Sequence, residues 1–244
     1  MRRSGYHGSY YLNRDFKEAG PYRNSLFDQD FRNSKIDGYL STLQLGLMLD
    51  KRDNEAAPTT GYWLEGSVRG ATRFIGSDWD YLGANLSARF YWPVDKGHRL
   101  VVASQTILDN IIGDLPYDAM SRVGGSAYLN DLNAFGGQYI GRGIRDQMFV
   151  GRLKAIEQLE LRYNFYDFNL GTQNFALTGA LFGDLGVASW DLSKLSRDLQ
   201  SIHSGFGGGL RINWNKTFVI RADLALSPTE NYSPRFYLVV GNIF

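Results

Sequence analysis

The chain has 244 residues and carries 26 basic and 25 acidic side chains, a balance that favours no polyanionic partner such as a nucleic acid. No apolar run approaches the roughly 18 residues that a membrane-spanning helix needs, and the absence of cysteine excludes disulfides and thiolate metal sites. An aromatic content of 14% together with 28 glycines is typical of a membrane β-barrel, in which aromatic girdles and glycine-relieved strands use both residue types.

Alternation of apolar and polar residues predicts about ten strands, many of them longer than the roughly five or six residues usual in globular proteins. The segment 80–93 alternates most regularly, with Leu82 and Leu86 on one face and Asn85 and Arg89 on the other. The first strand is the weakest of the series. In chain order the predicted strands are 5–13, 36–51, 61–74, 80–93, 98–112, 148–165, 174–188, 203–214, 217–227 and 235–244.

The connections between these strands alternate in length. Short turns are predicted at 95–97, 167–171 and 215–216, and long polar loops at 14–35, 113–147 and 189–202. Short turns on one side and long loops on the other are typical of an outer-membrane barrel. We therefore predict an all-β fold, an antiparallel transmembrane β-barrel, with residues 1–244 forming a single outer-membrane β-barrel domain.

The last predicted strand, 235–244, shows most clearly what surrounds the barrel. Phe236, Leu238 and Val240 form a fully apolar face with no turn after it, which indicates contact with lipid. The alternative is a soluble lipocalin-like barrel or β-sandwich with its apolar faces inward. The charged or glycine-rich opposite faces of many strands favour the membrane barrel.

Six segments occur in a fixed order that is informative as a set: 49–61, 134–144, 160–162, 182–186, 221–223 and 241–244. In order and spacing they resemble the C-terminal barrel of the BamA/TamA outer-membrane assembly family, also called bacterial surface antigens. That family's barrel has sixteen strands, preceded by periplasmic POTRA domains or other fused domains. The resemblance therefore implies that this chain is the C-terminal part of a larger barrel and contains no POTRA or enzyme domain.

The resemblance further implies that 113–147 is a long loop directed into the lumen, with Arg142 and Gly143 at its tip. A guanidinium can bind two carboxylates, and strand alternation puts Glu160 and Asp184 on lumen faces of adjacent strands. In the family, such carboxylates hold the loop arginine; the alternative is that they belong to a general ladder of mixed charges. At period two, three glycines are expected to clear a strand face for the loop backbone: Gly205, Gly207 and Gly209.

Two further segments carry family features. The periplasmic turn after the second strand is expected to be held by pairing across the strand ends and by a fixed return, through Asp50, Arg52, Asp53, Pro58 and Gly61. The terminal strand resembles the sorting strand that the barrel-insertion machinery reads, through Phe236, Leu238, Val240, Gly241 and Phe244.

The sequence predicts no catalytic, metal or cofactor site. His7, His98 and His203 lack the spacing of metal ligands, and no Gly-x-Ser-x-Gly nucleophile motif occurs. We therefore predict a protein that is not an enzyme.

We predict an integral protein of a bacterial or organellar outer membrane, with a periplasmic C-terminus, that assists the insertion or translocation of proteins. A two-partner-type secretion pore, or a membrane-anchor barrel for a missing N-terminal domain, remains an alternative. The expected partners are the lipid bilayer, client or accessory outer-membrane proteins, and the barrel-assembly machinery for the chain's own insertion. Because no export signal precedes the first strand, Met1 is expected not to be the native start, and any closure between 5–13 and 235–244 is expected to be poorly hydrogen-bonded.

Overall fold

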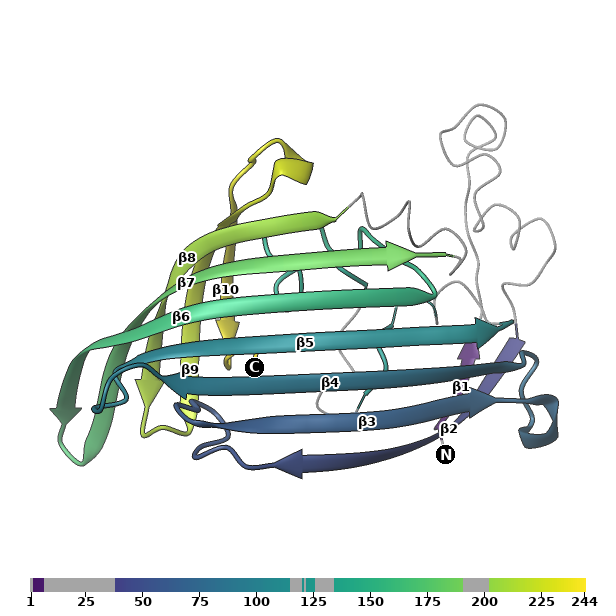
Figure 1. The fold of residues 1–244 in the computed structure, drawn as a ribbon, viewed down its shortest axis with the longest axis horizontal. Coiled ribbons are helices and arrows are strands. Elements are labelled where there is room, and N and C mark those ends of the chain that lie inside the picture. The colour runs from purple at the N-terminus through teal and green to yellow at the C-terminus, as the bar shows by residue number, and fades with distance from the viewer. Residues whose placement is uncertain (1, 7–37, 115–119, 121, 126–133, 191–201) are drawn as a thin grey trace.

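The structure is a computed structural model, and it describes residues 2–6, 38–114, 120, 122–125, 134–190 and 202–244. Its strands form one antiparallel sheet in which each strand pairs with its neighbours in the sequence (Figure 1). The predicted all-β fold is confirmed. The strands are β1 (Arg2–Tyr6), β2 (Gly38–Asp50), β3 (Gly61–Ala71), β4 (Tyr81–Pro93), β5 (Leu100–Gly113), β6 (Leu153–Leu170), β7 (Gln173–Ser189), β8 (His203–Trp214), β9 (Phe218–Leu226) and β10 (Arg235–Val240).

The two faces of the sheet differ sharply in polarity, as the alternation predicts. On β4, Leu82 and Leu86 are 56% and 61% exposed on the convex face, whereas Asn85 and Arg89 are 1% and 9% exposed on the concave face. The same apolar-outward, polar-inward pattern runs from β3 to β9. The apolar face of this sheet points outward, whereas the apolar faces of a soluble β-sandwich point inward and form its core.

The sheet curls into a partial barrel. In Figure 1, β9 and β10 lie behind the front strands, as expected when a long sheet bends back toward its own beginning. Among the described residues, β1 pairs only with β2 and β10 only with β9, so no backbone ladder closes the sheet. One side-chain contact crosses the opening, since Asn242 Nδ2 donates to the carbonyl oxygen of Ala56 at 2.7 Å.

The strands predicted at 61–74 and 5–13 differ from the observed ones. The strand predicted at 61–74 ends at Ala71, because Thr72 caps a short 3-10 helix, η1 (Arg73–Ile75). Of the strand predicted at 5–13, the described part is β1, which ends at Tyr6, and the rest lies outside the described residues. No helix in the described part of the chain is long and apolar enough to cross a membrane.

β6 has the same length, 18 residues, as the strand predicted at 148–165 but lies further along the chain, so both of its predicted ends are wrong. β6 begins at Leu153 and continues to Leu170, so the predicted turn at 167–171 is wrong. A register shift between Asn164 and Tyr166 lets the strand continue past the expected end, and Gly171 at φ +61° then reverses the chain into β7.

The C-terminal segment is the largest departure from the predicted strand 235–244. β10 ends at Val240, and Gly241 adopts a φ of +97°, a conformation that favours glycine. The chain then turns inward, and Phe244 is only 3% exposed, packed with Tyr91 and Ala103 on the concave face. Gly241 and Phe244 therefore do not continue the outward-facing pattern.

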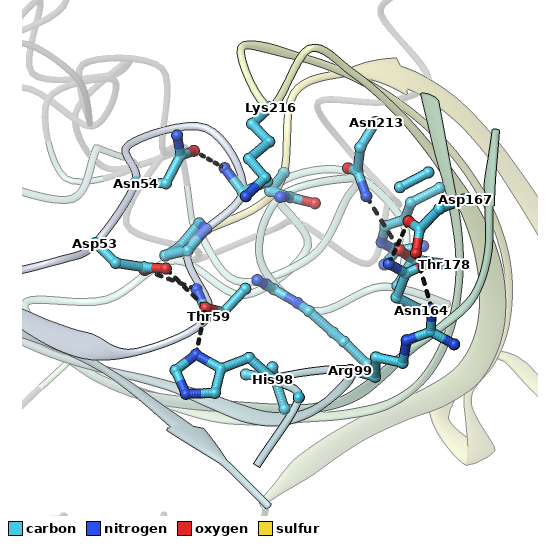
Figure 2. Close-up of a pocket in the computed structure, with 18 of the residues that line it drawn as sticks. Asp53, Asn54, Thr59, His98, Arg99, Asn164, Asp167, Thr178, Asn213 and Lys216 are labelled. Carbon is cyan, nitrogen blue, oxygen red and sulfur yellow. Dashed lines mark hydrogen bonds and ion pairs between the residues drawn. The ribbon is translucent and has the colours of Figure 1, made fainter. Parts of the chain in front are cut away.

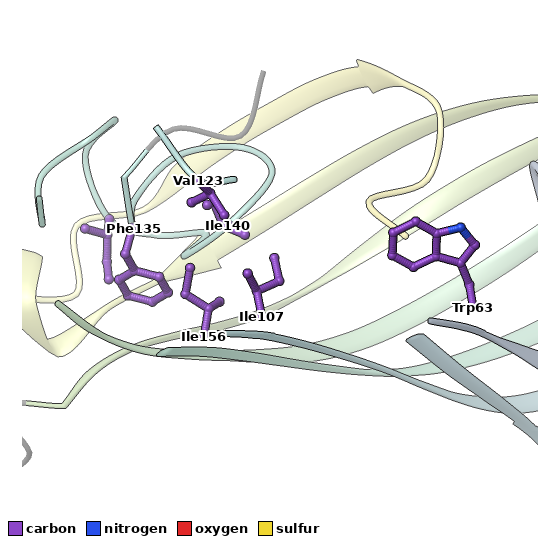
Figure 3. Packing of buried hydrophobic residues seen from close by; sticks show 7 residues of the cluster. Trp63, Ile107, Val123, Phe135, Ile140 and Ile156 are labelled. Carbon is purple, nitrogen blue, oxygen red and sulfur yellow. The ribbon is translucent and has the colours of Figure 1, made fainter. Parts of the chain in front are cut away.

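A buried apolar cluster joins the concave face to the loop between β5 and β6 (Figure 3). Ile107 and Ile156 come from the sheet, and Phe135 and Ile140 come from the loop. These side chains gather in one place in Figure 3, whereas Trp63 lies apart from them. Burial of each such side chain contributes roughly 1.5–3 kcal/mol, so the described part of the loop packs as an integral piece of the barrel interior.

Candidate functional site

Arg142 lies in the loop segment after Phe135 and is fully buried against the concave face. Its Nε and Nη2 atoms donate to the two oxygens of Asp184 on β7 at 2.9 and 2.7 Å, and its backbone N–H donates to the same carboxylate at 2.8 Å. Its Nη1 atom donates to Glu160 on β6 at 2.6 Å. These four hydrogen bonds connect the loop to two adjacent strands.

A third carboxylate and further arginines extend this site. Asp223 on β9 lies 3.4 Å from Arg142 Nη1 and also binds Arg211 at 2.6 Å and Arg221 at 2.9 Å. Glu160 in turn binds Arg211 at 3.1 Å. Glu160 also binds Arg162 at 2.7 Å, so four guanidinium groups meet three carboxylates. We call this set the arginine cluster: Arg142, Arg162, Arg211 and Arg221 with Glu160, Asp184 and Asp223.

Mutual pairing is what makes such a buried cluster tolerable. Removing one partner of a buried ion pair leaves an uncompensated charge and costs about 3–5 kcal/mol. Burial lowers the pKa of Arg142, but the carboxylates of Asp184 and Glu160 outweigh it and hold the pKa above its ordinary value, so the side chain stays charged. The guanidinium also lies 3.5 Å from the centre of the Phe182 ring, a favourable cation–π position.

The backbone around Arg142 fits closely against β8, β9 and β10. A Cβ at Gly205 would collide with the carbonyl oxygen of Arg142, so the absence of a side chain here lets the loop backbone approach β8. Gly143 has a φ of +89°, and a Cβ there would lie 2.7 Å from the backbone of Leu226. Its N–H donates to the hydroxyl of Tyr237 at 3.1 Å. A side chain at Gly205 or at Gly143 would therefore displace the loop backbone from the strands.

The other two glycines of β8 serve different neighbours from those predicted. At Gly207 a Cβ would collide with the backbone oxygen of Leu224 and would lie 2.8 Å from Phe182 Cζ, so this glycine makes room for the β9 backbone and for the ring beneath the guanidinium. At Gly209 it would collide with the carboxylate of Asp223 and lie 2.8 Å from Arg211 Nη1. The nearest atoms at both positions belong to the sheet and not to the loop backbone, because the strands in register with β8 carry the bulky members of the cluster.

A second set of ion pairs holds the earlier part of the same loop. Asp109 on β5 accepts from Arg69 Nη1 and Nη2 at 2.8 and 3.0 Å and from Lys154 Nζ at 3.3 Å. It also accepts from the backbone N–H of Gly124 at 3.0 Å, and Lys154 donates to the carbonyl oxygen of Arg122 at 3.1 Å. The described loop is therefore attached to the sheet at two separate places.

The pairing predicted at the β2–β3 turn differs in detail. Arg52 binds Asp50 through Nε at 2.9 Å and Nη2 at 2.6 Å. These residues are only two apart, so the Asp50–Arg52 pair lies at one strand end and does not span the turn. The Asp50–Arg52 ion pair restricts the backbone at the end of β2, before the turn begins.

Asp53 is the residue that spans this turn. Its carboxylate accepts from Thr59 Oγ1 at 2.7 Å and from the backbone N–H groups of Thr59 and Thr60 at 2.8 and 3.0 Å. Burial raises the pKa of Asp53, but these hydrogen bonds outweigh it and bring the pKa below its usual range. Pro58 is buried, and Gly61 at φ +101° lies against the Lys51 carbonyl group, where a side chain would collide.

A cavity of about 730 Å³ lies at the turn end of the strands and reaches the arginine cluster (Figure 2). Arg162 and Arg211 line it, and both bind Glu160. Figure 2 shows that polar side chains surround the opening, among them Asp53, Thr59, His98, Arg99, Asp167 and Asn213. Two wall residues of the arginine cluster thus lie at the boundary of this cavity.

In the described residues, no group of three or more His, Asp or Glu side chains could hold a metal ion. His98 lies at the cavity rim beside Thr59, at 3.3 Å, and His203 stacks on Phe149 with ring centres 3.4 Å apart. His7 lies outside the described residues.

The structure brings together the predicted loop residues and the predicted wall residues, but places the β2–β3 turn and the C-terminal strand elsewhere. Sequence reasoning included 221–223 among the family-like segments but did not assign Asp223, Arg221 or Arg211 to the loop contact, and it missed the second attachment at Asp109. Strand alternation contains the signal, because Asp223 alternates with Arg221 on one face of β9 and Asp109 shares a face with buried Ile107. Alternation alone does not show which of the inward charges meet.

A curled antiparallel sheet with an apolar convex face and a loop bound to its charged concave face defines an integral β-barrel membrane protein. The sequence profile of the Omp85 superfamily domain matches residues 5–244, so the chain belongs to this superfamily, whose members are outer-membrane β-barrel proteins. The crystal structure of BamA from Haemophilus ducreyi lacking POTRA domains 1–3 has a similar fold, with a TM-score of 0.57 and 16% identity. The match covers 84% of this chain and 42% of that BamA chain. No curated protein sequence matches the chain.

Proposed function

We propose that the chain is part of an outer-membrane protein that assists the insertion or translocation of other proteins, and that Arg142 locks its loop to the barrel wall. The observation that carries the proposal is the buried pairing of Arg142 with Asp184 at 2.7 Å and Glu160 at 2.6 Å. Apolar packing would stabilise a barrel wall at least as well as buried ion pairs. The cluster therefore supports a requirement for one fixed loop position.

The proposed mechanism is mechanical and involves no bond-making chemistry. The arginine cluster ties β6, β7, β8 and β9 to the loop, which stiffens this side of the barrel. Within the described residues, β10 pairs only with β9, so its other edge has no strand partner. The edge of β2 opposite β3 pairs with β1 only as far as Thr42 and has no strand partner beyond it. An edge strand of this kind can pair with a strand of a client protein by β-augmentation. The stiff side of the barrel, β6 to β9, would then hold the unpaired edge of β10 in place for the client.

We propose a periplasmic C-terminus, with client or accessory outer-membrane proteins and the barrel-assembly machinery as partners. The sorting strand would be read before the chain folds. Phe236 and Leu238 remain 67% and 68% exposed in the folded sheet, but Phe244 is buried and Arg162 donates to its carbonyl oxygen at 3.0 Å. A receptor that recognises Phe244 would therefore need the unfolded segment.

The test reconstitutes the full chain in liposomes and measures the rate at which a small, unfolded client barrel becomes protease-resistant. We expect insertion to be faster than in empty liposomes, and Arg142→Ala to remove most of that acceleration. Arg145→Ala is the matched control, because Arg145 is in the same loop but its side chain is 66% exposed on Glu230. Equal rates for the wild type, Arg142→Ala and empty liposomes would contradict the proposed function and favour a secretion pore or an anchor.

A further inference from the structure

Within β3 to β9, one charged side chain lies on the convex, lipid-facing surface of the sheet. Across the outward positions of β3 to β9, all of them in the described residues, the side chains are apolar, glycine, aromatic, hydroxyl or amide, except for Glu157. Glu157 shares the outward face of β6 with Leu159 and Leu161, which are 51% and 41% exposed. A carboxylate on a lipid-facing strand surface is costly and marks a functional site unless it is paired.

Two hydroxyl groups on the neighbouring strand hold this carboxylate in place. Ser104 Oγ donates to Glu157 Oε1 at 2.7 Å, and Thr106 Oγ1 donates to Glu157 Oε2 at 2.5 Å. Each oxygen of a carboxylate can accept two hydrogen bonds, so these contacts leave acceptor capacity directed away from the sheet. No basic side chain shares the outward faces of β3 to β9, so the complement to Glu157 has to come from outside this part of the sheet.

A groove of about 470 Å³ on the same outward surface extends to Thr106, one of the two hydroxyl residues that bind Glu157. It is lined by Thr106 and by exposed leucines, including Leu47, Leu86 and Leu108, which are 85%, 61% and 45% exposed. The groove exists because Gly66 has no side chain. A Cβ at Gly66 would find Leu86 Cδ2 at 3.4 Å as its nearest neighbour, so backbone crowding does not require glycine there.

We propose that this surface binds a phospholipid with a primary ammonium headgroup, whose acyl chain lies in the groove and whose ammonium donates to Glu157. A largely apolar groove of ligand-pocket size lined by Thr106, whose hydroxyl binds the Glu157 carboxylate on the next strand, matches an amphiphile with a cationic hydrogen-bond donor. An ethanolamine headgroup supplies N–H donors, whereas a choline headgroup supplies none and a glycerol headgroup leaves the phosphate anion uncompensated beside the carboxylate.

A second outward groove provides an internal comparison. It measures about 480 Å³ and is lined by Leu161, Leu181, Leu210 and three glycines, with no charged side chain. A Cβ at its Gly208 would find Leu181 Cδ2 at 3.4 Å, the same distance to the same kind of atom as at Gly66. This groove is expected to accept acyl chains without selecting a headgroup.

The test is native mass spectrometry of the purified full chain titrated with ethanolamine, choline and glycerol phospholipids of identical acyl chains. We expect the ethanolamine lipid to bind about tenfold more tightly than the choline lipid, the ratio that one charge-assisted hydrogen bond supplies. Glu157→Gln keeps the size of the side chain and should make the affinities for the ethanolamine and choline lipids equal. Gly66→Leu should remove the selective site, and Gly208→Leu should leave it unchanged.

Glu157→Gln gives a result even if Gly66→Leu disturbs the strand, because it changes no packing volume. Equal binding of the three lipids by the wild type, or an ethanolamine preference that survives Glu157→Gln, would overturn the proposal. A photo-crosslinker placed at Leu108 in native membranes distinguishes a lipid from a protein as the occupant of the groove. Lipid adducts support the proposal, and a specific protein adduct would contradict it.

Discussion

Arg142 and Asp184 are 42 residues apart in the sequence and are joined by three hydrogen bonds, two from the guanidinium and one from the backbone N–H of Arg142. The side-chain bonds fix the orientation of the guanidinium, and the backbone bond fixes the path of the loop itself. A lysine at this position could donate a hydrogen bond to the carboxylate but could not reproduce the planar, bidentate geometry of the guanidinium.

Arg142→Lys is therefore expected to weaken the attachment, and Arg142→Ala to break it. In the alanine variant Asp184 and Glu160 each lose a buried partner, which costs about 3–5 kcal/mol. Native-state hydrogen exchange of residues 134–147 measures this directly and should show faster exchange in the order wild type, lysine, alanine. Exchange unchanged in Arg142→Ala would mean that other contacts hold the loop.

The alternation of residues predicted the strands and the lumen faces well, because each of these properties depends on the local period of two. What it could not predict is the meeting of charges across strands. Arg211 faces Arg221 in the sheet register, and this like-charged pair is tolerated only because Asp223 and Glu160 lie beside it. Register and loop path decide such contacts, and neither is local in sequence.

The inward turn at Gly241 escaped prediction for a related reason. The residues from Phe236 to Val240 alternate as a strand should, and nothing in the final four residues breaks the pattern except one glycine. The gain from burying Phe244 against Tyr91 and Ala103 is a tertiary effect. Glycine permits that turn but does not by itself require it.

The second loop attachment should be independent of the first. Asp109→Asn leaves Arg69 and Lys154 as buried cations without their carboxylate, at a cost of about 3–5 kcal/mol. Exchange at residues 122–125 should speed up more than exchange at 140–144. Asp167→Asn is the control, since the Asp167 side chain is 49% exposed in its pair with Arg99. Equal effects of the two substitutions would show that burial of the pair is irrelevant.

Gly205→Ala tests the close approach of the loop backbone to β8. The new methyl group would collide with the Arg142 carbonyl oxygen and should destabilise the protein by about 1–3 kcal/mol, measured by chemical unfolding. Gly183→Ala is the matched control, because a Cβ there meets nothing within 4 Å on the outward face of β7. The same loss of stability in both variants would argue against a backbone contact at Gly205.

The β2–β3 turn should be sensitive to acid. Hydrogen bonds lower the pKa of Asp53 below its unfolded value of 3.8, so its stabilisation is fully present above that value. The stabilisation is then lost as the pH falls through the lower, folded pKa. Exchange at the Thr59 and Thr60 amides, corrected for intrinsic rates, should increase over this window and should be flat in Asp53→Asn. A flat profile in the wild type would contradict this assignment.

A double-mutant cycle between Arg142→Ala and Asp184→Ala tests the central claim most directly, with the free energy of opening of residues 134–147 as the readout. If the two side chains hold the loop together, the double variant should lose less stability than the sum of the single variants. The coupling energy should then lie between about 0.5 and 3 kcal/mol. Additive losses, with no coupling beyond error, would contradict the lock and the function proposed from it.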